Sequence, residues 1–390
     1  MQMIPGNQIT LLQNGEAYFP AIEAAFDRAV REIYLESYIF ENDNTGRRIA
    51  EALRRAAFRG VKTRVLIDGF GSNSLPKAMA DSLEAAGVMV LKFRPKTSPW
   101  TLRRRRLRRL HRKIVVVDRE IAFVGGINII DDMAKPGQTS PRYDYAVSVE
   151  GPLVAEIFDS ASRVWSRVAW IRFRRGWGRV GDGQAPSTGS RGRMRSAFLV
   201  RDNIRHRRDI EDAYLQAIEQ AKFEIILANA FFFPGLNLRH ALLNAAGRGV
   251  RVILLLPGRV KYPLLHYASH ALRGSFLDAG IEIYEYHKSL MHAKVAVIDE
   301  HWTTVGSSNL DPFSLLLSLE ANVVVDDENF AGTLKHSLNQ AIHTGSRRIL
   351  QDQWRTQPIR LRLAGWLSYG LVRLMIGMTG YAPGKKSGRI

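Results

Sequence analysis

Apolar and polar residues follow two periods along the chain, one typical of helices and one typical of strands. In the first half, an amphipathic pattern over residues 19–30 predicts a helix, and the apolar run at residues 33–40 predicts a strand. This alternation favours an α/β fold with a buried, mostly parallel sheet. Further helices are expected at residues 46–58 and 76–86, and further strands at residues 61–68 and 88–93.

The second half of the chain repeats this order. A helix is expected at residues 208–221, and the apolar run at residues 223–232 matches residues 31–40. Residues 176–196 are rich in Gly, Ser and Pro, which predicts a linker between two equivalent lobes. The expected domains are an N-terminal lobe over residues 1–175, the linker over 176–196, a C-terminal lobe over 197–350 and a basic, aromatic tail over 351–390.

A duplicated block is the most specific feature of the sequence. Residues 111–128 read HRKIVVVDREIAFVGGIN, and residues 292–309 read HAKVAVIDEHWTTVGSSN. One short His-Lys-Asp pattern occurs easily by chance, whereas two copies at identical spacing do not. A duplication predicts lobes related by a pseudo-twofold axis, with both blocks in one shared cleft. The matching residues are His111 and His292, Lys113 and Lys294, Asp118 and Asp299, and Asn128 and Asn309.

The His and Lys of each block suit chemistry on a phosphodiester. Side chains alternate along an extended segment, so His111 and Lys113 share one side, as do His292 and Lys294. One imidazole can attack phosphorus while the other, protonated, donates to the leaving alcohol. The two ammonium groups stabilise the anionic oxygens, so this site needs neither metal nor cofactor.

The ends of the block strands carry further candidates. The Gly-rich turns deliver Asn128 and Asn309 as hydrogen-bond donors to the phosphate. Asp118 and Asp299 are candidates for direct catalysis, and equally for a structural role at the strand end.

Each histidine also needs an acceptor on its second ring nitrogen, because that bond fixes the tautomer. Asp144 opens the alternating stretch DYAVSVE, and Glu320 opens the similar stretch EANVVVD. We expect these two carboxylates to orient the histidines.

The charge of the chain points to an anionic partner. Its 390 residues hold 56 Lys and Arg against 37 Asp and Glu, a net charge of +19, which suits nucleic acid, anionic lipid or a phosphorylated substrate.

The absence of Cys excludes disulfides, thiolate metal sites and a cysteine nucleophile. No signal peptide is expected. The apolar run at residues 363–378 contains Arg373 and is expected to lie against protein or a membrane surface.

The two copies HRKIVVVD and HAKVAVID, with GGIN and GSSN, resemble the HKD motifs of the phospholipase D superfamily over nearly the whole chain. The stretches YLESYIF, YDYAVSVEGPLV and VGSSNLDPFSLLLSLEANVVV are similar to bacterial cardiolipin synthases. Because no N-terminal membrane helices are expected, the resemblance implies the B type.

This resemblance implies two tandem phospholipase D-like α/β/α sandwich lobes and a phosphatidyl transfer. His111 would form a phosphohistidine, and His292 would act as general acid and then as base. Phosphatidylglycerol would donate the phosphatidyl group to a second phosphatidylglycerol, with phosphatidylethanolamine open as an alternative donor. The expected location is peripheral, on the cytoplasmic side of the bacterial inner membrane.

Two other functions stay open at this level. Water could replace the acceptor alcohol, giving a phosphodiester hydrolase, or the positive charge could serve a superfamily nuclease. The tyrosyl-DNA phosphodiesterase branch typically lacks the motif Asp that is present here twice, so nucleic acid is not the expected partner. The basic segment at residues 94–112 is expected to rest on an anionic membrane, with a solvated loop or nucleic-acid affinity as the alternatives.

Overall fold

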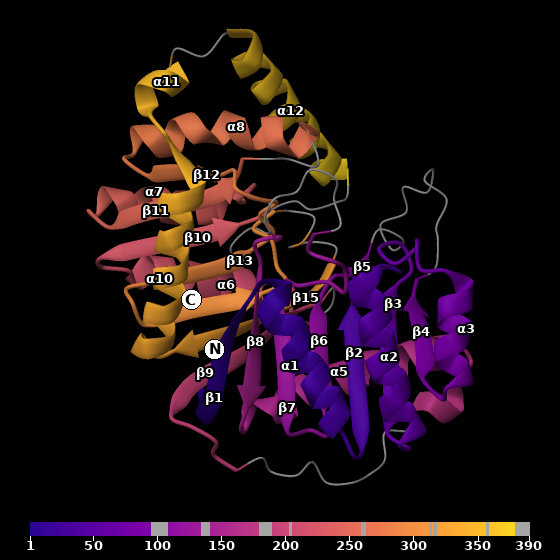
Figure 1. The fold of residues 1–390 in the computed structure, drawn as a ribbon. Coiled ribbons are helices and arrows are strands. Elements are labelled where there is room, and N and C mark those ends of the chain that lie inside the picture. Colours follow the sequence, from indigo (N-terminus) through magenta and orange to yellow (C-terminus); the bar gives the residue numbers. More distant parts are fainter. Residues whose placement is uncertain are drawn as a thin grey trace, which may run out of the picture.

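The computed structural model describes the chain except for residues 95–107, 134–140, 179–188, 203–204, 259–262, 312–313, 315–317, 356–358 and 379–390. Its strands join in one sheet with the order β16-β12-β11-β10-β13-β14-β15-β9-β1-β8-β7-β6-β2-β3-β4. Counted outward from the central pair β9-β1, corresponding strands of the two halves come in the same order. The sheet therefore consists of two lobes that meet at β9 and β1 (Figure 1).

Each lobe contains three parallel strands, because a helix connects each strand to the next. On one face of each lobe these helices pack against the strands around a separate core. The first lobe has β2 (Glu32–Ser37), β3 (Lys62–Asp68) and β4 (Met89–Phe93), with α1 (Asn14–Arg28), α2 (Asn44–Phe58) and α3 (Lys77–Ala85). The second has β10 (Glu224–Asn229), β11 (Arg251–Pro257) and β12 (Glu282–Tyr286), with α6 (Asp209–Gln220), α7 (Leu236–Gly247) and α8 (Pro263–Asp278).

The duplicated blocks form antiparallel strands beside these parallel ones. The prediction of a mostly parallel sheet is therefore wrong. The turns at residues 118–120 and 299–301 are too short for a crossover helix and force a hairpin in each block. The antiparallel strands of the first lobe are β6 (Lys113–Val117), β7 (Ile121–Gly125) and β8 (Tyr145–Glu150). Those of the second lobe are β13 (Lys294–Ile298), β14 (Trp302–Gly306) and β15 (Ser318–Asp326).

Two strands join the lobes at the centre of the sheet. β1 (Ile4–Gln13), which the sequence patterns did not predict, pairs with β8 of its own lobe. β9 (Met194–Arg201) pairs with β15 and begins inside the predicted linker. β1 and β9 then pair with each other across a register irregularity. The lobes thus share a continuous sheet.

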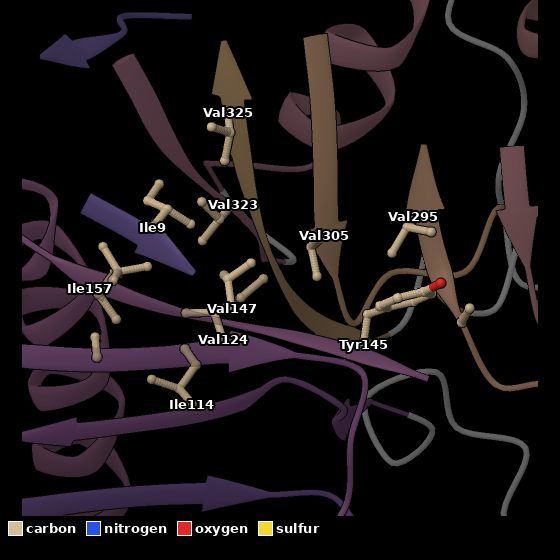
Figure 2. Packing of buried hydrophobic residues seen from close by; sticks show 14 of the residues in the cluster. Ile9, Ile114, Val124, Tyr145, Val147, Ile157, Val295, Val305, Val323 and Val325 are labelled. Atoms are coloured by element: carbon tan, nitrogen blue, oxygen red, sulfur yellow. The ribbon is translucent and has the colours of Figure 1, made fainter. Parts of the chain in front are cut away.

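A single hydrophobic core also crosses the boundary. It combines side chains under α5 (Leu153–Ile171) of the first lobe with side chains under α10 (Glu328–Gly345) of the second. Figure 2 shows Val124 and Val147 of the first lobe beside Val305 and Val323 of the second. Burial of this apolar surface opposes separation of the lobes.

The remaining elements extend the second lobe and join the two blocks. Helix α12 packs against α8, as Figure 1 shows at the outer end of the second lobe. None of the helices among the described residues has the length and apolar composition needed to cross a bilayer. These elements are β5 (Arg109–Leu110), the short helix η1 (Arg175–Gly178), β16 (Ser346–Ile349), α11 (Gln351–Arg355) and α12 (Ile359–Met378).

Candidate active site

The backbone of each block histidine is held by the opposite lobe. β5, directly before His111, pairs with the start of β15, and the His111 N–H donates to the carbonyl of Leu319 at 3.0 Å. In the second lobe, the His292 N–H donates to the carbonyl of Tyr143 at 2.8 Å. Both histidines therefore lie where the two lobes meet.

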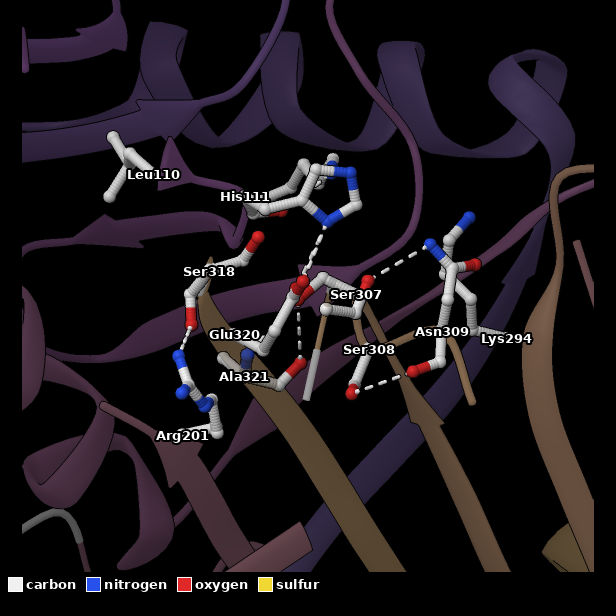
Figure 3. A network of polar contacts seen from close by, with 12 residues as sticks. Leu110, His111, Arg201, Lys294, Ser307, Ser308, Asn309, Ser318, Glu320 and Ala321 are labelled. Atoms are coloured by element: carbon white, nitrogen blue, oxygen red, sulfur yellow. Dashed lines mark hydrogen bonds and ion pairs between the residues drawn. The ribbon is translucent and has the colours of Figure 1, made fainter. Parts of the chain in front are cut away.

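The side chains of the histidines cross the same boundary. Nδ1 of His111 lies 3.0 Å from a carboxylate oxygen of Glu320, which belongs to the second lobe (Figure 3). Nδ1 of His292 lies 2.6 Å from a carboxylate oxygen of Asp144, which belongs to the first lobe. Because Nδ1 faces a carboxylate in both rings, Nε2 is the atom that each imidazole offers to a ligand.

A buried lysine accompanies each histidine. Nζ of Lys113 donates to the His111 carbonyl at 2.5 Å, and Nζ of Lys294 donates to the His292 carbonyl. Nζ of Lys294 also lies 2.8 Å from Nδ1 of His292 and 3.8 Å from the Asp144 carboxylate. These contacts place both ammonium groups against the histidines.

Burial shifts the protonation of this cluster. It lowers the pKa of Lys113 to about 7 and that of Lys294 to about 8, although nearby Glu320 and Asp144 oppose the shift. Burial and the charge on Lys294 lower the pKa of His292 to about 3. The pKa of His111 is lowered mainly by burial. Bringing an anion into this cluster would favour the protonated forms of all four groups.

The carboxylate of Asp144 responds in the opposite direction. Burial alone would raise its pKa, but the positive charge of Lys294 and the contact with His292 outweigh burial and lower it. Asp144 therefore stays ionised and can hold the Nδ1 proton of His292.

The segments that follow β7 and β14 differ at one position, which is Gly126 in the first lobe and Ser307 in the second. Each of these residues lies against a histidine-binding carboxylate, Asp144 or Glu320. A Cβ on Gly126 would overlap the carboxylate of Asp144, so any side chain at that position would require the carboxylate to shift. The equivalent Ser307 donates through its hydroxyl to the carboxylate of Glu320 at 2.5 Å (Figure 3). Gly126 with Asp144, and Ser307 with Glu320, therefore form matched pairs.

The block aspartates lie away from this site, which favours the structural role over direct catalysis, the two alternatives that the sequence left open. Asp118 follows β6 at the end opposite Lys113, five residues and about 16 Å along the strand. Its carboxylate accepts hydrogen bonds at 2.8 Å from the N–H groups of residues 30, 31 and 32, at the start of β2. Asp299 likewise accepts from the N–H groups of residues 222, 223 and 224, at the start of β10.

The conformation of these aspartates also has a structural reason. Asp118 and Arg119 both have positive φ, at 53° and 60°, and the N–H of Glu120 donates to the carbonyl of Val117 at 3.0 Å. Two adjacent residues with positive φ make the two-residue turn that suits a hairpin, and Asp tolerates this region better than most residues. Asp299 and Glu300 repeat the arrangement at 50° and 59°.

The block asparagines are buried beside the site and already contact protein. Oδ1 of Asn128 accepts from the N–H of Ile39 at 3.1 Å. Nδ2 of Asn309 donates to the hydroxyl of Ser314 at 3.3 Å, while its buried Oδ1 has no hydrogen-bond partner within the described part of the chain. Both amides thus fix loops next to the histidines, and only Asn309 keeps a buried polar atom unused there.

Comparison with known proteins gives this arrangement a family. The family model described as "Cardiolipin synthase, PLD-like domain" matches residues 22–164 and 214–342. The chain belongs to this family. It is similar to cardiolipin synthase B of Salmonella typhi, with 42% identity over 344 residues, 88% of this chain and 82% of the relative. Cardiolipin synthase B of Escherichia coli K12 is 41% identical over 353 residues, with the same coverage.

A solved structure shows the same fold in a more distant protein. The phosphatidylserine synthase of Haemophilus influenzae superposes with a TM-score of 0.69 at 14% identity, covering 94% of this chain and 93% of that chain. At that identity the likeness concerns the fold alone. The predicted two-lobed phospholipase D-like fold is confirmed.

Two groups beside His111 were missed in the sequence. The ring of Tyr38 lies 4.9 Å from the His111 ring and 5.6 Å from Nζ of Lys113. Arg112 forms a buried ion pair with Glu36. The sequence pattern that could have predicted this ion pair is the charged residue Glu36 within an apolar strand. The second lobe has Ala228 and Ala293 at the equivalent positions.

Other predicted features can be placed only in part. Most of the basic segment at residues 94–112 lies outside the described residues. Within the described ranges, no three His, Asp or Glu side chains are grouped closely enough to hold a metal ion.

Proposed function

We propose that this protein is a cardiolipin synthase that transfers the phosphatidyl group of one phosphatidylglycerol to the hydroxyl of another. Family membership and relatives named cardiolipin synthase B support the reaction class. The observation that carries the proposal is the pair of partly exposed histidines, each facing a carboxylate of the other lobe. We infer that the two Nε2 atoms act on one phosphodiester, because both histidines lie at the boundary between the lobes.

In the first half-reaction, Nε2 of His111 attacks phosphorus and forms a P–N bond. The P–O bond to the head-group glycerol breaks, and His292 gives its Nε2 proton to the departing glycerol oxygen. Glu320 stabilises the positive charge that develops on His111, while Asp144 holds the tautomer of His292. The products are free glycerol and a phosphatidyl group on His111.

In the second half-reaction, a hydroxyl of a second phosphatidylglycerol replaces the glycerol. His292 takes the proton of this hydroxyl, the oxygen attacks phosphorus, and the P–N bond breaks to release cardiolipin and free His111. Each half-reaction moves one proton through the same imidazole. This symmetry requires the leaving and entering alcohols to occupy the same place beside His292.

Substrate binding supplies the protonation that the first step needs. The pKa of His292 is lowered to about 3 by burial and by Lys294, so an empty site would not hold a protonated general acid at neutral pH. A phosphodiester anion between the two blocks raises this pKa and those of Lys113 and Lys294. The ammonium groups then stabilise the non-bridging oxygens, with Asn309 as a further donor if its amide turns Nδ2 toward the phosphate.

The structure suggests no particular donor head group. We assign phosphatidylglycerol as the donor on the resemblance to the family, with phosphatidylethanolamine as the alternative that leaves ethanolamine in place of glycerol. We also place the protein peripherally on the cytoplasmic side of a bacterial inner membrane, where both phosphatidylglycerol molecules are available.

The reaction is tested by incubating purified protein with phosphatidylglycerol vesicles and resolving lipids and water-soluble products by mass spectrometry. Cardiolipin and free glycerol in equal amounts are expected. Phosphatidic acid in place of cardiolipin would make water the acceptor and the protein a hydrolase. Cardiolipin formed only after phosphatidylethanolamine is added would change the donor.

A further inference from the structure

Helix α12 has two apolar faces, and only one of them is used by the fold. The inner face contacts the second lobe: Val372 is fully buried, and the Tyr369 ring packs against Phe233 at 5.5 Å. At Gly365 the helix approaches α8 so closely that a Cβ would lie 3.2 Å from the Tyr267 carbonyl. The inner face of α12 is therefore covered by the second lobe.

The outer face carries a continuous apolar stripe, which we call the α12 stripe. Successive members are three or four residues apart, except for the adjacent Trp366 and Leu367, so they lie on one side of the helix. All of them are exposed although they are large: Leu363 (56%), Trp366 (56%), Leu367 (74%), Leu371 (47%) and Leu374 (62%).

The path of the helix brings this stripe to the edge of the sheet that carries the site. Gln351 donates to Asp278 at the end of α8, and Gly365 lies beside residue 267 near its start, so the chain runs back along α8. Tyr369 then reaches Phe233, whose N–H donates to the carbonyl of Leu310 at 2.9 Å. Leu310 follows the block residue Asn309, so Tyr369 of α12 is connected through Phe233 to the segment that follows the second block.

The charges around the stripe favour one occupant. The sequence of α12 contains three arginines and no Asp or Glu, and the exposed Arg373 lies beside Tyr369. In the first lobe, Leu110 is tied to Asp68 at the same edge, and there Phe70 is 58% exposed under the guanidinium of Arg109. Apolar side chains flanked by arginine suit a bilayer with anionic head groups.

We propose that the α12 stripe docks this protein on an anionic lipid bilayer, with α12 lying in the plane of the membrane surface. This inference rests on the proposed function, in that a lipid substrate has to pass from a bilayer to the paired histidines. It adds the surface through which that contact is made. A second copy of the chain is the rival occupant.

Cosedimentation with vesicles of phosphatidylglycerol and phosphatidylcholine tests the proposal without any need for turnover. A double variant, Leu367→Glu with Leu371→Glu, should lower the vesicle partition coefficient by at least about tenfold, because two carboxylates would enter the apolar layer. The matched control is Phe58→Glu, since Phe58 is 67% exposed at the end of α2 next to the start of β3, on the opposite edge. The control should bind as the native chain does.

A labelling experiment tests the same docking without relying on correct folding of the double glutamate variant. The chain has no Cys, so Leu367→Cys creates a single site for an environment-sensitive fluorophore. With the proposed docking, anionic vesicles shift its emission to the blue and nitroxide lipids quench it, while a label at Phe58→Cys does not respond. An unresponsive label at residue 367 would overturn the proposal.

Two further outcomes separate the possible failures. If the double variant binds vesicles normally but changes from dimer to monomer in sedimentation, a second copy covers the stripe and the proposal is wrong. Short-chain phosphatidylglycerol below its micelle concentration tests the chemistry alone, and the double variant should turn it over like the native chain. Loss of vesicle binding with no turnover of either lipid by the native chain would support docking and overturn the proposed function.

Discussion

The carboxylate of Asp144 in the first lobe lies 2.6 Å from Nδ1 of His292 in the second. Glu320 of the second lobe holds His111 of the first in the same way, at 3.0 Å. Each lobe therefore completes the other's catalytic group. Neither half of the duplication contains an oriented histidine by itself, and the continuous sheet and shared core keep the two halves in register.

We expect Asp144→Asn and Glu320→Gln each to lower kcat by about 10²- to 10⁴-fold, because an amide of the same shape can bind the wrong tautomer and cannot stabilise an imidazolium. Steady-state kinetics on phosphatidylglycerol vesicles measure this loss. Vesicle binding and thermal unfolding serve as controls and should change little. Turnover within about threefold of the native chain in either variant would remove the carboxylates from the mechanism.

The block aspartates should behave differently. Asp118→Ala or Asp299→Ala removes an acceptor of three backbone N–H groups, so we expect the free energy of unfolding to fall by about 2 to 4 kcal/mol. Denaturant titration measures this loss. The protein that stays folded should keep its kcat within a few fold. A large loss of kcat at unchanged stability would restore a catalytic role for these residues.

Gly126 and Ser307 allow a reciprocal exchange. Gly126→Ser should displace Asp144 from His292 and lower kcat by about 100-fold, because small misplacements of catalytic groups are costly. Ser307→Gly removes one hydrogen bond to Glu320 and should cost only about tenfold. Equal effects of the two substitutions would show that Gly126 has no special relation to Asp144.

Ligand binding should be accompanied by proton uptake. The pKa values of Lys113 and Lys294, about 7 and 8 in the empty site, rise when a phosphodiester anion enters, so protons are bound near pH 7.5. Titration calorimetry with dimethyl phosphate, in buffers of different ionisation enthalpy, measures the uptake. Lys113→Met should reduce it. Binding without proton uptake would mean that both lysines are already charged in the free protein.

The sequence predicted the repeated parts well and the contacts between them poorly. The two blocks, their lobes and the identity of Asp144 and Glu320 followed from patterns that occur twice. β1 was missed because its stretch, IPGNQITLLQ, is interrupted by Gly, Asn and Gln and gains its stability from β8 and β9. Each carboxylate binds the histidine of the other lobe, and this depends on which strands meet at the lobe boundary. No local sequence pattern contains that information.

The block aspartates illustrate a second limit. Asp118-Arg119 lacks the glycine that usually marks a two-residue hairpin turn, so the turn was hidden and the aspartate resembled a catalytic group. The sequence placed both aspartates at a strand end, and only the hydrogen bonds to the backbone before β2 and β10 distinguish the structural role from the catalytic one.

The central claim is that the phosphatidyl group passes through His111 with His292 as its proton donor. The most direct test is to quench the protein during turnover of phosphatidylglycerol, digest it at a pH that preserves phosphohistidine, and map the adduct by mass spectrometry. We predict a phosphatidyl group on His111 that disappears as cardiolipin forms, and no adduct in His111→Ala. An adduct on His292, or cardiolipin formed by the His111→Ala variant, would contradict the assignment.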